Sequence, residues 1–202
     1  MGRQPFSVVE ATIPEMQTAM NDGRVTSREL VTQYLLRIAT YNSKLNAVIT
    51  INPNALKEAD ALDRERARGK VRGPLHGIPI ALKDNMHTID MPTAGGALAF
   101  RGLVPPYEAT LTKNLRAAGA IIIAKTTMTE LANWVAGGPT PMPGGYNALI
   151  GYSMNPYDPR RDPREETFDG RPVLATGGSS SGVARLQASG LQMWEARRPA
   201  RF

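Results

Sequence analysis

The chain has 202 residues, enough for one globular domain with a sizeable core. Hydrophobic residues make up 42% and charged residues 21%, which excludes disorder over the whole length. The net charge of +6 raises the question of nucleic-acid binding, but aromatic residues amount to only 6%. Cysteine is absent, so disulfides, a thiol nucleophile and cysteine-bound zinc are excluded.

Residues 12–69 have a helical pattern. Thr12 with Glu15, and Thr26 with Glu29, have the spacing of capping boxes that begin helices. Apolar residues recur at helical spacing after Thr26. A third helix is expected from about residue 53 to Gly69, and its run 63–66 mixes acidic and basic residues as a solvated face does.

The pattern then alternates between strands and helices. Residues 76–83 form a short apolar run that ends in Lys83 and predict a buried strand. Residues 109–118 predict a helix, and 120–124 predict the clearest strand in the chain. Thr127 or Thr129 could cap a further helix through residue 134. Strand, crossover helix and strand together predict an α/β sheet.

A long segment rich in glycine and proline, 137–182, ends in the serine run at residues 177–182, Gly-Gly-Ser-Ser-Ser-Gly. Glycines allow close approach of a substrate to the backbone, and successive amide groups can form an anion-binding concavity. The alternative is a flexible Gly/Ser linker, which the run alone does not distinguish from a site.

Two common catalytic templates fail. Residues 178–182 fit the G-x-S-x-G nucleophile elbow, but that template needs a histidine after the serine, and His76 and His87 both precede it. These two histidines have no metal-ligand spacing, so we expect no metal and interpret both as polar surface residues. Lysine is the remaining base, and Lys83 at a strand end is the candidate. The alternative is a lysine that only snorkels or pairs with Asp84.

Three sequence blocks resemble the amidase signature family, in the order and at a spacing typical of it. Residues 73–85, Gly-Pro-Leu-His-Gly-Ile-Pro-Ile-Ala-Leu-Lys-Asp-Asn, resemble its lysine motif. Residues 108–130 resemble its next block, and Asn155-Pro156-Tyr157 with residues 177–182 resemble the block after that. The resemblance covers roughly residues 7–183 and implies the N-terminal part of a mixed α/β amidase fold.

The resemblance implies hydrolysis of amide C–N bonds by a Ser–Ser–Lys triad without metal or cofactor. It makes Lys83 the base and Ser179 the bridging serine, which in this family lies on a cis peptide bond. Gly177, Gly178, Ser180 and Ser181 would line the same loop near the substrate, without a triad role.

The nucleophilic serine of the family follows the bridging serine at a spacing that passes Phe202. Residues 183–202 are arginine-rich and do not resemble the family, and Ser189, their only serine, lacks the paired glycines. We therefore expect a truncated amidase that is inactive alone, with a tail that arises from a frameshift. If neither alternative frame of the downstream DNA encodes a Gly-Gly-Ser turn, the frameshift hypothesis is wrong.

We divide the chain into an N-terminal helical segment, 1–69, a partial α/β core, 70–182, and an atypical tail, 183–202. The expected ligand is a small-molecule amide, with no nucleic-acid partner. No stretch predicts a membrane span or signal peptide, so a cytoplasmic protein is expected. The alternative is a non-catalytic fragment or an interaction domain on an amidase scaffold, and the oligomeric state stays open.

Overall fold

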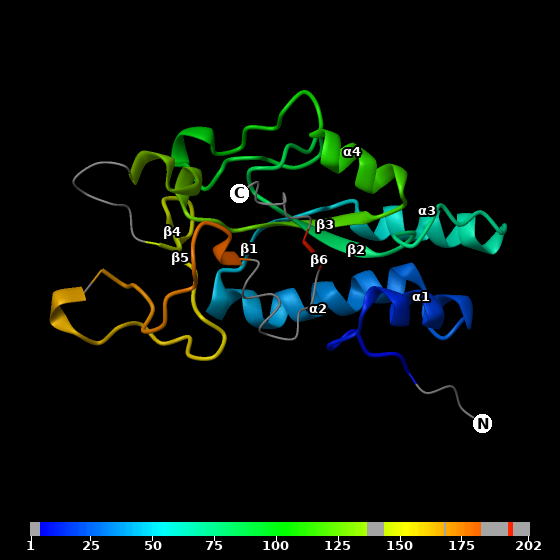
Figure 1. Ribbon diagram of the computed structural model, residues 1–202, viewed down its shortest axis with the longest axis horizontal. Helices are drawn as coiled ribbons and strands as arrows, with labels where there is room; N and C mark the ends of the chain where they lie inside the picture. The colour runs from blue at the N-terminus through cyan, green and yellow to red at the C-terminus, as the bar shows by residue number, and fades with distance from the viewer. Residues whose placement is uncertain (1–4, 137–143, 168, 183–193, 196–202) are drawn as a thin grey trace, which may run out of the picture.

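The computed structural model describes residues 5–136, 144–167, 169–182 and 194–195. Figure 1 shows an elongated molecule built around a central sheet. In chain order the elements are α1 (Ile13–Asn21), α2 (Ser27–Leu45), β1 (Val48–Ile51), α3 (Ala55–Ala67), β2 (Pro79–Lys83), η1 (Leu98–Phe100), α4 (Thr110–Ala117), β3 (Ile121–Thr126), η2 (Glu130–Ala136), β4 (Tyr146–Asn147), β5 (Gly151–Tyr152), η3 (Glu165–Thr167) and β6 (Trp194–Glu195).

Helices α1 and α2 begin where the capping boxes predict. The Thr12 side chain accepts from the Glu15 amide, and the Glu15 carboxylate accepts from the Thr12 amide. Thr26 and Glu29 repeat this reciprocal arrangement at the start of α2. Each box satisfies two amides that the first helical turn leaves without partners, so local sequence determines where these helices begin.

The sheet has the strand order β1-β3-β2-β6. Strand β3 runs parallel to β2 and antiparallel to β1, and α4 lies in the crossover between β2 and β3. Strands β4 and β5 form a separate two-stranded sheet. The mixed α/β architecture is therefore confirmed, and the strands predicted at 76–83 and 120–124 form its centre as β2 and β3.

Strand β1 lies inside the segment predicted to be helical. It is only four residues long, and the Asn42 side chain organises the turn before it by accepting from the amides of Ala47 and Val48. A strand this short, which pairs with a strand distant in sequence, gives no periodic signal.

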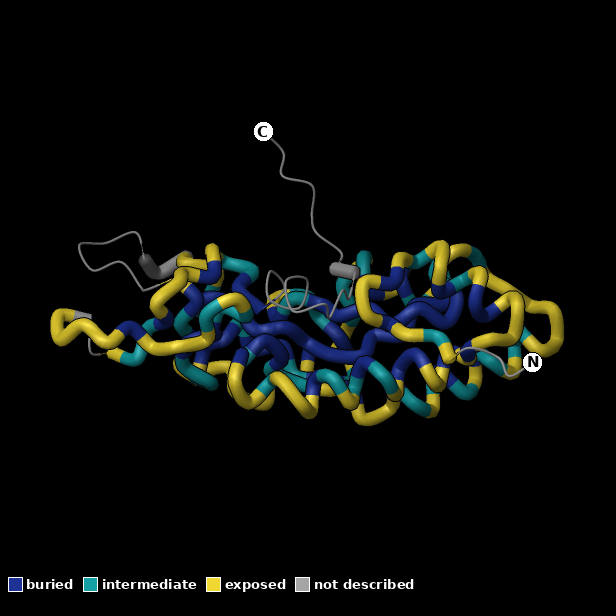
Figure 2. The backbone as a smooth tube through the Cα atoms, turned by 90° about the horizontal axis from the view of Figure 1, so that it is seen from below, coloured by how far each residue is buried: buried dark blue, intermediate teal, exposed yellow. Residues whose placement is uncertain are grey.

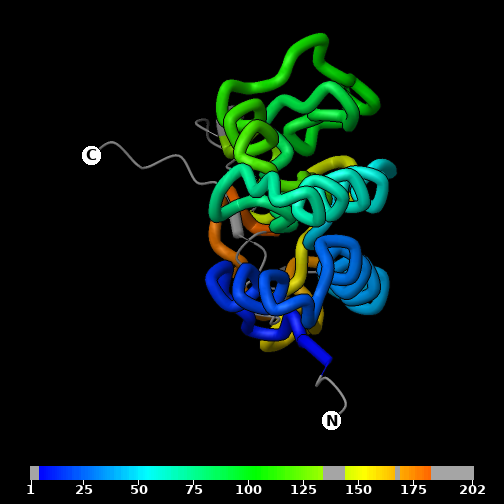
Figure 3. The backbone as a smooth tube through the Cα atoms, turned by 90° about the vertical axis from the view of Figure 1, so that its right-hand side faces the viewer, coloured from blue at the N-terminus to red at the C-terminus, as the bar shows by residue number. Residues whose placement is uncertain are grey.

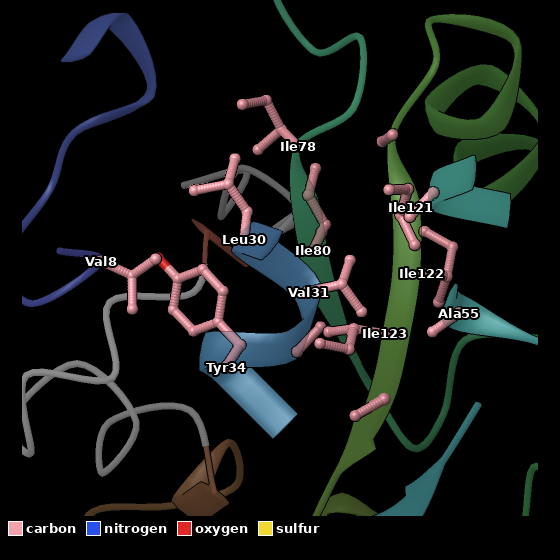
Figure 4. Close-up of a cluster of buried hydrophobic side chains, with 14 of the residues drawn as sticks. Val8, Leu30, Val31, Tyr34, Ala55, Ile78, Ile80, Ile121, Ile122 and Ile123 are labelled. Atoms are coloured by element: carbon pink, nitrogen blue, oxygen red, sulfur yellow. The ribbon is translucent and has the colours of Figure 1, made fainter. Parts of the chain in front are cut away.

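The core lies between the sheet and the helices on its two faces. Helices α1 and α2 cover one face, and α4 lies on the other (Figures 1 and 3). On β3, Ile123 points toward Val31 of α2, whereas Ile122 points toward Ala55 of α3 (Figure 4). Buried residues follow the central strands along the molecule, as Figure 2 shows. A strand buried on both faces explains the continuous apolar run at 120–124.

Two sequence expectations are wrong. His76 is fully buried: its Nδ1 accepts from the Arg72 amide at 3.3 Å, and its Nε2 lies 3.0 Å from the carbonyl oxygen of Leu62. Both ring nitrogens thus have backbone partners, which offset the cost of burying a polar ring.

The expected helix after Thr127 is instead η2, in which residues 131–133 have left-handed backbone angles. His87 is half-buried, with its ring 5.1 Å from that of Tyr107.

A buried ion pair joins β2, β3 and the loop at 92–96. Lys125 Nζ lies 3.3 Å from Asp84 Oδ1, and their side chains are 0% and 2% exposed. Asp84 Oδ2 also accepts from the amides of Ala94 and Gly96, while Lys125 donates to the Thr93 hydroxyl. Burial raises the pKa of Asp84 and lowers the pKa of Lys125, and each charge opposes the effect on its partner.

Gly182 packs the end of the serine run directly against the sheet. Its amide donates to the Thr127 carbonyl at 3.1 Å. A Cβ added at this position would overlap the carbonyl oxygen of Ala47 and lie 2.7 Å from the Thr127 amide nitrogen. Because both neighbours are backbone atoms, only a glycine fits here.

No helix in the described part of the chain is long and apolar enough to cross a membrane. The boundaries proposed at 69/70 and 182/183 stay a prediction. Of the tail, only Trp194 and Glu195 are described, as the edge strand β6 parallel to β2. Ser189 and the rest of residues 183–202 lie outside the described residues, so the frameshift interpretation also stays a prediction.

We predict that Gly182→Ala lowers the free energy of unfolding by about 1–3 kcal/mol, because the new methyl group must displace backbone atoms. The control is Gly144→Ala, where an added Cβ meets no described atom within 4 Å and a change within about 0.5 kcal/mol is expected. Urea unfolding measures both. Equal stability of the two variants would contradict the packing of the serine run.

Lys125→Met leaves the Asp84 carboxylate buried without its cation, so we expect a loss of about 3–5 kcal/mol in unfolding free energy. Adding Asp84→Asn should recover part of this loss, because a neutral amide oxygen still accepts from the loop amides. The control Arg28→Met breaks an exposed pair with Asp60 and should cost less than about 1 kcal/mol. A similar cost for Arg28→Met and Lys125→Met would show that burial of the pair has no energetic consequence.

Candidate functional site

The candidate site lies at the carboxyl end of β2, where Lys83 meets the serine run. Lys83 Nζ donates to Ser179 Oγ at 2.7 Å, across 96 positions of sequence. Both residues are half-buried, so the pair is reachable from solvent. The structure thus brings together the two residues that the family resemblance implies as base and bridging serine. Their roles stay a prediction.

The serine run is anchored to the segment that follows β3. The Ser179 carbonyl accepts from the Thr129 amide at 3.0 Å, and Gly182 bonds to Thr127. The Gly178–Ser179 peptide bond is cis, and Gly177 has a φ of 72° that favours glycine. These two hydrogen bonds, at Ser179 and at Gly182, hold the run against the segment after β3, which differs from the flexible linker that its composition also allowed.

The three consecutive serines have different surroundings. Ser179 contacts Lys83, whereas Ser181 is fully buried with its hydroxyl 3.2 Å from that of Ser153. Ser153 also donates to the Gly145 carbonyl, so the contact of Ser181 with Ser153 helps to hold the serine run against the segment 145–153. Ser180 is half-buried, and Gly177 and Gly178 are exposed beside the lysine–serine pair. The composition of the run could not separate these surroundings, because the three side chains are identical, and only the family resemblance singled out Ser179.

The alternative that Lys83 pairs with its neighbour Asp84 is wrong. Asp84 follows the last residue of β2 and pairs with the buried Lys125 instead. Lys83 directs its amine to Ser179.

A left-handed turn missed by the sequence analysis borders the site. Leu131, Ala132 and Asn133 have φ values of 45°, 57° and 66°, which are unfavourable for leucine and alanine and better tolerated by asparagine. The Leu131 amide donates to the Gly95 carbonyl, so this turn is tied to the loop around Asp84. The side-chain Nδ2 of Asn133 would lie 3.6 Å from a Cβ added at Gly178. Such strain persists where surrounding contacts enforce it, as at functional sites.

The pair is suited to proton transfer between oxygen and nitrogen. A neutral lysine amine can take a proton from a serine hydroxyl at this distance, and a serine that has lost its proton can in turn take one from another hydroxyl or attack a carbonyl.

Comparison with known proteins identifies the family of the chain. A family model described as amidase matches residues 29–194. One subunit of the glutamyl-tRNA(Gln) amidotransferase from Streptomyces avermitilis is 34% identical over 183 residues, which is 90% of this chain and 33% of the relative.

Two solved structures have the same fold. The peptide amidase from Stenotrophomonas maltophilia matches with a TM-score of 0.79 and 40% identity, over 93% of this chain and 36% of its own. An amidase family protein from Bacillus anthracis matches with a TM-score of 0.75 and 39% identity, over 89% of this chain and 33% of its own. The chain therefore spans about a third of the length of these relatives. Because the family model matches well over half of its residues, the chain belongs to the amidase family.

Proposed function

We propose that this chain supplies the base and the bridging serine of an amide-hydrolysing site that works by a Ser–cis-Ser–Lys mechanism. The observation that carries the proposal is the 2.7 Å hydrogen bond from Lys83 Nζ to Ser179 Oγ. It joins the two residues that the family resemblance selects, on a loop with the cis bond at Gly178–Ser179 that the resemblance implies.

In the proposed reaction, neutral Lys83 takes the Ser179 proton while Ser179 takes the proton of the nucleophilic serine. That serine attacks the amide carbonyl, and the proton returns through the same relay to the departing amine. Water then releases the carboxylic acid from the acyl-enzyme. The chemistry of this relay uses no metal or cofactor.

The nucleophile of this proposal is not among the described residues. Ser189 is the only serine after Ser181, and it lacks the Gly-Gly-Ser context that would also provide an oxyanion hole. The 202 residues therefore hold two of the three members of the proposed triad.

The proposed substrate class is a small-molecule amide, with no nucleic acid as ligand. The named relatives include a peptide amidase and one component of a glutamyl-tRNA(Gln) amidotransferase, so substrates differ widely within the family. A cytoplasmic location is part of the proposal and is supported by the lack of cysteine, which suits a reducing compartment.

The 202-residue polypeptide alone should not turn over a simple aryl amide such as p-nitroacetanilide. Loss of a triad nucleophile costs on the order of 10⁶ in rate, which places turnover below detection. Release of p-nitroaniline, followed by absorbance, measures this. Turnover by the purified chain that disappears in Lys83→Ala would show that the chain holds a complete site.

A chimera tests the proposed roles directly. Residues 1–182 are joined to the part of the Stenotrophomonas maltophilia peptide amidase that this chain does not cover, and amide turnover is measured. We expect turnover that falls at least about 100-fold in Lys83→Met and in Ser179→Ala, because general-base transfer is lost. Lys113→Met, at an exposed position on α4, is the matched control and should keep full turnover.

If a soluble chimera with native circular dichroism gives no turnover, the non-catalytic alternative is favoured. Turnover that survives Lys83→Met would instead assign the base to another residue.

A further inference from the structure

We infer that Ser179 is itself a nucleophile, which Lys83 activates to take an acyl group from an activated ester. This activity needs only the two residues that already touch in the structure. It shares their contact with the proposed function, but it requires neither a third serine nor amide cleavage.

The contact has the geometry of an activated nucleophile. A serine and its base act together when their heavy atoms lie about 2.6–3.2 Å apart, and the Lys83–Ser179 distance is 2.7 Å. Lysine serves as the base for serine in two-residue sites on unrelated folds.

The serine is accessible and fixed at the same time. Ser179 is half-buried and follows the exposed Gly177 and Gly178, so a small ester can reach its hydroxyl. A Cβ added at Gly178 would make only ordinary van der Waals contacts, at 3.6 Å from Asn133 and 3.8 Å from Thr129. The bond from the Thr129 amide to the Ser179 carbonyl holds the residue in place, which reduces the entropy cost of reaction.

The hydroxyl group of Ser181 is placed differently from that of Ser179. Ser181 has no exposed surface, and its hydroxyl faces Ser153. Ser179 is therefore the candidate nucleophile of the run, whereas Ser181 holds the run against the neighbouring segment.

The step is an acyl transfer that balances. Ser179 Oγ forms a bond to the ester carbonyl carbon, and its proton moves to Lys83 Nζ. The bond from that carbon to the leaving oxygen breaks, and p-nitrophenolate departs when the ester is p-nitrophenyl acetate. The products are acetyl-Ser179, protonated Lys83 and p-nitrophenolate.

The experiment mixes the 202-residue chain with p-nitrophenyl acetate and follows p-nitrophenolate release, then locates acetyl groups by peptide mass spectrometry. We expect acetylation of Ser179 that is lost in Ser179→Ala and slowed about 100-fold in Lys83→Arg. Arginine keeps the positive charge but does not act as a base, so this variant separates base from charge. Lys113→Arg, at an exposed site, is the matched control and should label at the unchanged rate.

Circular dichroism and urea unfolding of each variant exclude loss of fold as the cause, and Lys83→Met provides a second removal of the base. Acetyl groups found on other residues but not on Ser179 of the unaltered chain would overturn the inference. So would equal rates of Ser179 labelling in the unaltered chain and in folded Lys83→Arg. Ester labelling and chimera turnover are separate readouts, so either proposal can fail while the other stands.

Discussion

The parallel pairing of β2 with β3 is the constraint on which the site depends. The register aligns Lys83 with Thr126, so both strands end at the same edge of the sheet. The residues just after β3 then lie beside Lys83, and it is these residues, Thr127 and Thr129, that bind the serine run. A contact between residues 83 and 179 thus follows from the alignment of two neighbouring strands.

The buried Asp84–Lys125 pair fixes this edge from within the core. Taking two charges out of water costs free energy, and the two hydrogen bonds to Asp84 from loop amides offset part of that cost. An apolar pair could fill the same volume, but it could not hold the amides of Ala94 and Gly96. We interpret the ion pair as the interaction that determines which loop covers the carboxyl end of β2. The Lys83 side chain meanwhile faces Ser179.

The sequence predicts those parts whose signal is local. The capping boxes at Thr12 and Thr26 and the apolar run before Lys125 need no knowledge of the fold, and the structure confirms them. His76 was misjudged because its two backbone partners are set by tertiary packing. The left-handed turn at residues 131–133 was missed for a similar reason, since Leu131 and Ala132 have no intrinsic preference for that conformation.

The lysine–serine contact has a consequence that the family pattern alone does not express. A base that takes the proton of Ser179 leaves an electron pair on Oγ. That electron pair can accept another proton or attack a carbonyl carbon. When a second hydroxyl lies against Ser179, the Oγ electron pair takes the proton of that hydroxyl and Ser179 acts as a relay. When an ester carbonyl occupies the same place, the pair attacks carbon and the serine acts as a nucleophile. In the two proposals, the group opposite Ser179 therefore decides its role, while Lys83 and the anchored loop have the same part in both.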